Sequence, residues 1–234
     1  LLEEDRPDEA LAHYRAAEAL VPAAPEVYRG LSQALEATGD QAGATDARLR
    51  FLELGGGGSE AQGASDQIAA LTRAQELASG DNLEEALHEV ETILEGQPAS
   101  AAALVMKAKV LFALDRPREA LDAAIRAREV NPGIAEAHYL EGLVLSTGNR
   151  PAEAEVALRK AAELDPDLGA AFALLGAALS KQSRPEEAIE NFQRALDLGT
   201  DSRFLRLGYS SALEALGRAE EAAEQMEAYR RISR

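Results

Sequence analysis

The stretch AEAHYLEGLVLSTGNRPAEAEVALRKAAELDPDL, residues 135–168, is one unit of a repeat that runs through this 234-residue chain. Its alanine at position 154 recurs at intervals of 34 residues, with a single interval of 42 residues. This alanine column comprises Ala10, Ala44, Ala86, Ala120, Ala154, Ala188 and Ala222. A fixed period of this length is typical of proteins built from stacked structural repeats.

Each unit contains two segments with the periodicity of an amphipathic helix. In one first segment, Leu104, Ala108 and Leu111 are spaced by three or four residues, which places them on one helix face. The leucine column of the first segments comprises Leu35, Leu77, Leu111, Leu145, Leu179 and Leu213. A small residue three positions earlier would let two helices approach closely. Neither helix could bury its apolar face alone, so we expect the units to stack.

Prolines and glycines mark the expected helix ends. Strings of the form Arg-Pro-x-Glu open the second helix of several units, where proline suits the first helical position and glutamate faces the positive end of the helix dipole. These strings begin at Arg6, Arg116, Arg150 and Arg184. A glycine between the two helices suits a left-handed C-cap. The glycines expected in this conformation are Gly39, Gly80, Gly148 and Gly217.

Together these columns resemble the tetratricopeptide repeat family, whose pattern is W-x2-L-G-x2-Y, then A-x3-F, then P, over 34 residues. The best copy of the pattern holds His138, Glu141, Gly142, Leu145, Ala154, Leu158, Ala161 and Pro166. The resemblance covers nearly the whole chain. It implies an all-α fold, a right-handed α-solenoid of stacked helix-turn-helix units.

The 42-residue interval predicts one break in this solenoid. Eight additional residues there include Gly55-Gly56-Gly57-Gly58-Ser59, and such a segment is typical of a flexible coil. We therefore expect one and a half units from the end of an array in 1–54, a Gly/Ser-rich linker in 55–65, and a five-unit array in 66–234. The glycine run is a common engineered linker, so an artificial fusion and a natural glycine loop both stay open. Leu1 falls within a repeat, so we expect a longer parent protein.

Charge and composition narrow the classes of partner. The chain carries 41 acidic and 24 basic residues, a net charge of −17, which disfavours binding to nucleic acids and to anionic membrane surfaces. The acidic residues either solvate the outer helix faces or attract a basic partner. No apolar run approaches the roughly 20 residues of a membrane-spanning helix, so we expect no membrane insertion. The chain has no cysteine, which excludes disulfides but does not fix the compartment, so localisation stays open, with the cytoplasm favoured over the periplasm.

Nothing in the sequence gathers the groups of an active site, a metal site or a cofactor site, so we expect no enzyme, no metal and no cofactor. The three histidines are scattered, and His138 occupies a column in which the family places a packing aromatic residue. The glycine run lacks the third glycine of a dinucleotide fingerprint, because Glu60 and Ala61 stand where it is required.

The resemblance implies that the first helix of each unit lines a concave groove for peptides or helices. The predicted partner-binding residues are Ile68, Leu71, Val105, Lys109, Phe112, Tyr139, Leu143, Ala173, Ala177, Lys181, Phe204 and Leu207. This wall is unusually apolar for a surface, and Lys109 and Lys181 could meet a carboxylate on the partner. The lysine–asparagine pair that grips chaperone tails and the asparagine ladder of O-GlcNAc transferase are both absent, so an amphipathic helix or apolar peptide fits better.

We therefore expect a protein-interaction scaffold that binds a peptide or an amphipathic helix of a partner. One alternative is a homo-oligomer in which residues 1–54 dock onto another copy, since one and a half units fall below the roughly three repeats usually needed for stability. Another alternative is the substrate-recruiting arm of a larger enzyme.

Overall fold

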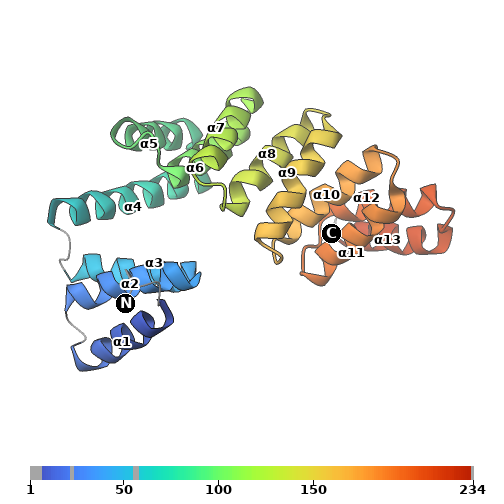
Figure 1. Ribbon diagram of the computed structural model, residues 1–234. Helices are drawn as coiled ribbons and strands as arrows, with labels where there is room; N and C mark the ends of the chain where they lie inside the picture. The colour runs from blue at the N-terminus through green and yellow to red at the C-terminus, as the bar shows by residue number, and fades with distance from the viewer. Residues whose placement is uncertain (1–6, 22–23, 55–57, 233–234) are drawn as a thin grey trace. The chain divides into compact units, whose positions relative to one another are not determined.

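A computed structural model describes residues 7–21, 24–54 and 58–232, and within them the chain forms thirteen helices and no strand (Figure 1). The helices are α1 (Pro7–Leu20), α2 (Pro25–Thr38), α3 (Gln41–Glu53), α4 (Gly58–Ser79), α5 (Leu83–Gly96), α6 (Ala101–Ala113), α7 (Pro117–Val130), α8 (Ala135–Thr147), α9 (Pro151–Leu164), α10 (Gly169–Lys181), α11 (Pro185–Asp197), α12 (Arg203–Ala215) and α13 (Ala219–Ile232). The chain divides into two compact units, Leu1–Ala70 and Leu71–Arg234, and the division falls inside α4. The all-α solenoid predicted from the repeats is confirmed.

The first unit is built around α2, which packs against both α1 and α3. Its buried core consists of Tyr28, Leu31, Leu35, Ala44 and Ala47. The Tyr14 ring of α1 lies so close to Gly30 that a Cβ atom at this position would overlap it. Glycine at this position of α2 therefore permits the close approach of α1.

In the second unit, first and second helices alternate. The pairs α6–α7, α8–α9, α10–α11 and α12–α13 pack as helical hairpins, and successive first helices also touch, α6 with α8, α8 with α10, and α10 with α12. Among the described residues, no two second helices approach in the same way. The array therefore curves with its first helices on the inner side (Figure 1).

The alanine column marks the contact between the two helices of a unit. Ala86, Ala120, Ala154 and Ala188 are completely buried, and Ala10, Ala44 and Ala222 are almost so. Opposite this column the first helices carry glycine at two places. A Cβ on Gly142 would lie 2.5 Å from Leu158 Cγ, and one on Gly176 would lie 2.9 Å from the Phe192 ring. Small residues on one helix thus make room for large apolar ones on the other.

The prediction that four glycines adopt the left-handed conformation between the two helices of a unit is correct for two of them and wrong for the other two. Gly39 and Gly217 are left-handed as expected, but Gly80 and Gly148 are not. In those units the residue that follows the glycine has the positive φ. Among the described residues, the left-handed column lies five residues before the column alanines from Ala44 onward, and it comprises Gly39, Asp81, Asp115, Asn149, Ser183 and Gly217. The length of the turn sets this position, and Asp and Asn tolerate the left-handed conformation better than most residues.

The second helices α7, α9, α11 and α13 begin with an arginine–glutamate ion pair. In the string that starts at Arg150, the guanidinium donates two hydrogen bonds, of 2.7 and 2.6 Å, to the Glu153 carboxylate. The same bidentate pairs join Arg116 to Glu119, Arg184 to Glu187 and Arg218 to Glu221. Hydrogen bonds from the arginine hold the pKa of each of these carboxyls below its usual range. The corresponding pair at Arg6 lies outside the described residues.

The linker prediction is wrong in part. Residues 58–65 of the expected coil belong to α4, while residues 55–57 lie outside the described part of the chain. From Glu60 onward the segment is rich in Ala, Gln and Glu, which have high helix propensity, and this favours an extension of the helix toward its N-terminus. The division into 1–54 and 66–234 as separate arrays stays a prediction.

Candidate functional site

The predicted groove residues differ widely in exposure. Phe204 and Leu207 on α12 are 53% and 51% exposed, and Ile68 on α4 is 43% exposed. Val105 and Ala173, by contrast, are buried, with 6% and 5% of their surface accessible. These two residues therefore support the wall from beneath and cannot contact a partner in this conformation.

Several of the remaining residues are apolar and lie on the first helices of the second unit. Phe112, Tyr139 and Leu143 are half-buried against the core between α6 and α8, and Tyr139 and Ala177 pack against the core between α8 and α10. Tyr139 thus joins the two cores. We call the apolar residues of these helices that the sequence predicted the inner wall; they are Phe112, Tyr139, Leu143, Ala177, Phe204 and Leu207. The sequence prediction missed Met106 and Leu174, which are also half-buried on these helices.

Both lysines of the predicted groove already have partners within the chain. Lys109 on α6 forms an ion pair with Glu136 at the start of α8. Burial, together with the charge of Glu136, raises the pKa of the nearby Tyr139. Lys181 Nζ donates a 3.1 Å hydrogen bond to the Ser146 carbonyl. Because an ammonium group has three donors, Lys181, whose residue is exposed, can still bind an anion.

Two predicted residues lie on α4, within which the chain divides. Ile68 belongs to the first unit and half-buried Leu71 to the second. The assignment of Ile68 to the same surface as the inner wall therefore stays a prediction.

The described residues contain no group of three or more His, Cys, Asp or Glu side chains that could hold a metal ion. His138 is 7% exposed, and its Nε2 donates a 3.0 Å hydrogen bond to the Pro132 carbonyl, as expected for a packing histidine. Among the helices described, none is long and apolar enough to cross a membrane.

The sequence profile of the tetratricopeptide repeat matches residues 1–58, 105–168 and 173–234, more than half of the chain. The chain belongs to the tetratricopeptide repeat family. The predicted family is thereby confirmed, and the inner wall lies on the helices that the resemblance named. Family membership supports a protein-interaction scaffold, and tetratricopeptide repeat proteins are generally non-enzymatic.

Solved structures show the same fold at low sequence identity. PilF of Pseudomonas aeruginosa is 22% identical, with a TM-score of 0.66 over 73% of this chain and 78% of that one. MamA from Desulfovibrio magneticus RS-1 is 20% identical, with a TM-score of 0.62 over 71% of this chain and 94% of that one. YrrB, described as a tetratricopeptide repeat protein with an unusual peptide-binding site, is 22% identical, with a TM-score of 0.58 over 70% of this chain and 85% of that one. No curated protein sequence matches the chain.

Proposed function

We propose that this protein is a non-enzymatic scaffold whose inner wall binds a peptide or an amphipathic helix of a partner protein. The observation that carries the proposal is the apolar surface on consecutive first helices, which ends in the exposed side chains of Phe204 and Leu207. Large apolar side chains in this position commonly mark a site of protein association.

The exposure pattern favours α12 as the main contact of the partner. Phe204 and Leu207 are one helical turn apart, so both lie on the same face of α12 and could hold one apolar face of a bound helix. Lys181 on the neighbouring α10 could meet an acidic residue at the edge of that helix. The fold is shared with YrrB, whose description names a peptide-binding site, and this adds support to a peptide or helix as the partner.

The test is a pull-down with the full chain, followed by peptide mapping of each retained protein. Its binding is then measured against Phe204→Glu/Leu207→Glu, which places two charges where the apolar contact is proposed. Both residues are about half exposed, so we expect the helical content and the midpoint of urea unfolding to stay unchanged. A true partner should bind this variant at least about tenfold more weakly, because interface anchors commonly contribute 2 kcal/mol or more.

The matched control is Val156→Glu, which adds one charge at a 72% exposed valine on α9, a second helix. Binding of the inner-wall partner should survive this change. If every partner binds Phe204→Glu/Leu207→Glu as tightly as the wild type, the inner wall is not the binding site. Sedimentation equilibrium of the same samples tests self-association through residues 1–54, which would give a mass that rises with concentration.

A further inference from the structure

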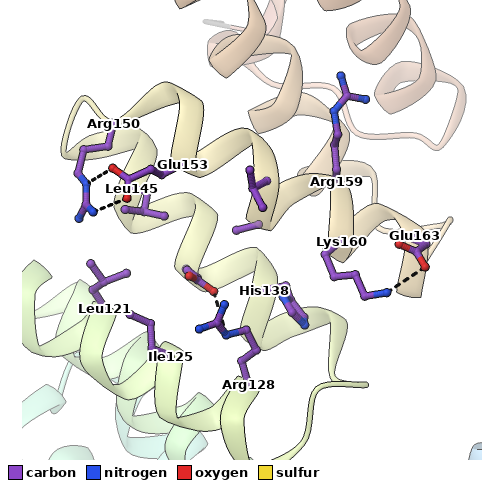
Figure 2. A pocket seen from close by; sticks show the side chains of 13 residues that line it. Leu121, Ile125, Arg128, His138, Leu145, Arg150, Glu153, Arg159, Lys160 and Glu163 are labelled. Atoms are coloured by element: carbon purple, nitrogen blue, oxygen red, sulfur yellow. Dashed lines mark hydrogen bonds and ion pairs between the residues drawn. The ribbon is translucent and has the colours of Figure 1, made fainter.

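The outer side of the second unit holds an open cleft that the proposed function does not use. It lies between the second helices α7 and α9, with α8 beneath, and has a volume of about 730 Å³ (Figure 2). We call it the outer cleft. Its apolar lining comprises Leu121, Ile125, Leu145, Val156 and Ala157. A volume of this size is typical of ligand pockets. Val156 is 72% exposed, so its side chain is accessible to a partner.

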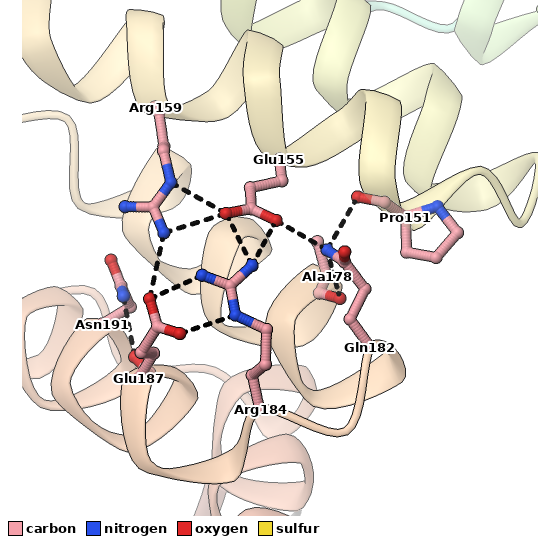
Figure 3. A network of polar contacts seen from close by, with 8 residues as sticks. All are labelled: Pro151, Glu155, Arg159, Ala178, Gln182, Arg184, Glu187 and Asn191. Atoms are coloured by element: carbon pink, nitrogen blue, oxygen red, sulfur yellow. Dashed lines mark hydrogen bonds and ion pairs between the residues drawn. The ribbon is translucent and has the colours of Figure 1, made fainter.

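The equivalent place one repeat further on, between α9 and α11, is filled by ion pairs. Arg184 Nη1 donates to both oxygens of Glu155, at 2.9 and 2.7 Å, and Arg159 Nη2 donates to Glu187 at 3.2 Å (Figure 3). Gln182 Nε2 donates a further 2.8 Å hydrogen bond to Glu155. We call these five side chains the polar bridge, because they link α9 to the end of α10 and the start of α11.

Two substitutions along the repeat explain why the outer cleft has no such bridge. Leu121 occupies the column of Glu155, and Ile125 occupies the column of Arg159. Neither apolar side chain can pair with the next second helix, so the Arg150–Glu153 pair remains local to the start of α9 (Figure 2). On the opposite wall Val156 stands in the column of Glu190. The bridging groups are thus replaced by an apolar lining.

A second crossing contact is also missing from the outer cleft. In the next repeat Arg194 donates to the Pro166 carbonyl, and in the previous one Arg126 donates to the Pro98 carbonyl. Here His138 takes the equivalent carbonyl, that of Pro132. Lys160, in the column of Arg126 and Arg194, pairs with Glu163 of its own helix instead (Figure 2).

The floor of the cleft contains a poorly satisfied acceptor. Glu141 contributes to the lining, its side chain is only 13% exposed, and its buried Oε2 has no hydrogen-bond partner among the described residues. Arg128 forms an ion pair with this carboxylate, but its Nε lies 3.6 Å from Oε2, beyond hydrogen-bonding distance. A buried acceptor without a hydrogen bond costs about 1–3 kcal/mol, so a donor that reached it would bind favourably.

We propose that the outer cleft is a second binding site, for a segment of a partner protein that carries a large apolar side chain within one helical turn of a lysine or arginine. The apolar side chain occupies the space between Leu121, Ile125 and Val156, and the basic group donates to Glu141. The cations that line the cleft do not oppose this partner strongly, because each forms an ion pair with a glutamate. Arg150 pairs with Glu153, Lys160 with Glu163, Arg128 with Glu141, and Arg159 with Glu155 and Glu187. The net charge of −17 attracts a basic segment at longer range.

The test is a selection of random phage-displayed peptides on the full-length wild-type chain, after depletion on Leu121→Glu/Ile125→Arg. This variant gives the outer cleft the counterparts of Glu155 and Arg159 of the polar bridge, with Arg150 and Glu153 already in place to pair with them. We expect the selected peptides to combine a large apolar residue with a nearby lysine or arginine. They should bind the double variant, and separately Val156→Glu, about tenfold more weakly than the wild type.

Two further variants locate the contact. With Glu141→Gln, a selected peptide should lose most of its preference for lysine over glutamine at the basic position. With Phe204→Glu/Leu207→Glu, on the inner wall, binding should not change, so this result separates the outer cleft from the proposed function. Circular dichroism should show the same helical content for all variants.

The proposal is overturned if the selected peptides are acidic, if none distinguishes the wild type from the double variant, or if Glu141→Gln leaves the lysine preference intact. Dimerisation of the wild-type chain that the double variant abolishes would also overturn it, because the cleft would then bind a second copy.

Discussion

The α7–α9 and α9–α11 clefts share one backbone arrangement and differ in a few side chains. Both have a second helix opened by an Arg–Glu pair, a small residue beneath it, and a buried large residue, Leu158 in one case and Phe192 in the other. One cleft is spanned by the polar bridge, and the other is open with an apolar lining. The comparison shows that a few positions outside the buried packing columns can decide whether a cleft closes.

The largest effect should come from the packing that both clefts share. Leu158 is fully buried and fits against Gly142, so Leu158→Ala removes a large side chain from the contact between α8 and α9. We expect a loss of about 2–5 kcal/mol in the free energy of unfolding, measured by urea titration. Val156→Ala, two residues away at a 72% exposed site, should change it by less than about 0.5 kcal/mol. Equal effects of the two changes would contradict this account of the packing.

A smaller loss of stability should distinguish the polar bridge from the Arg150–Glu153 pair beside the outer cleft. Glu155 is 13% exposed and accepts hydrogen bonds from Arg184, Arg159 and Gln182, so Glu155→Gln should cost about 1–2 kcal/mol. Glu153→Gln, in the exposed pair beside the outer cleft, should cost clearly less. The measurement is the urea midpoint of each variant. Equal destabilisation of the two variants would contradict a stabilising role for the polar bridge.

The stabilisation that Glu155 provides should depend on pH. Burial would raise the pKa of Glu155, but hydrogen bonds from Arg184, Gln182 and Arg159 outweigh it and lower the pKa. A carboxyl whose pKa is lowered by folding stabilises the protein above its unfolded value of about 4.3, and this stabilisation is lost as the pH falls further. The stability difference between wild type and Glu155→Gln should therefore be constant from about pH 7 to 5 and shrink below about pH 4.3. A difference that grew toward low pH would contradict this.

The smallest effect concerns the turns before the two second helices. Ser183, before α11, and Asn149, before α9, have φ values of 58° and 56°. Ser183→Gly should raise the free energy of unfolding by about 0.5 kcal/mol, because relief of left-handed strain exceeds the added entropy of the unfolded chain. Asn149→Gly should gain less, since asparagine tolerates this conformation. Thermal unfolding of both variants tests the order, and a lower Tm for Ser183→Gly would refute it.

The family, the helix pairs and the packing columns could be predicted from the sequence because they repeat. Ala154 and Leu145 were assigned to the core because their columns recur every 34 residues, and the structure places both in the core. The left-handed position was predicted correctly where it was glycine, at Gly39 and Gly217. It was missed at Asp81 and Asn149, because the neighbouring glycine suggested the wrong residue of the turn.

The surfaces were harder to predict because they depend on departures from the repeat. Val105 and Ala173 stand in columns that face a groove in the family, yet here they are buried, so the column alone does not give exposure. The outer cleft was missed altogether. A comparison of Leu121 and Ile125 with Glu155 and Arg159 would have indicated it, since apolar residues replace ionic ones in two columns at once.

The turn between the two helices of a unit, with its one left-handed residue, bears on which side chains can change without loss of the fold. In six turns the N–H just before the next helix donates to the carbonyl of the column leucine, as from Arg150 to Leu145 and from Arg184 to Leu179, so each of these turns is held by a main-chain hydrogen bond. Side chains on the outer faces of α7, α9 and α11 are therefore free to change while the hairpins keep their form. The cleft between each neighbouring pair of second helices can therefore change independently of the others. A few substitutions can convert a cleft closed by ion pairs into an open binding cleft without a change of fold.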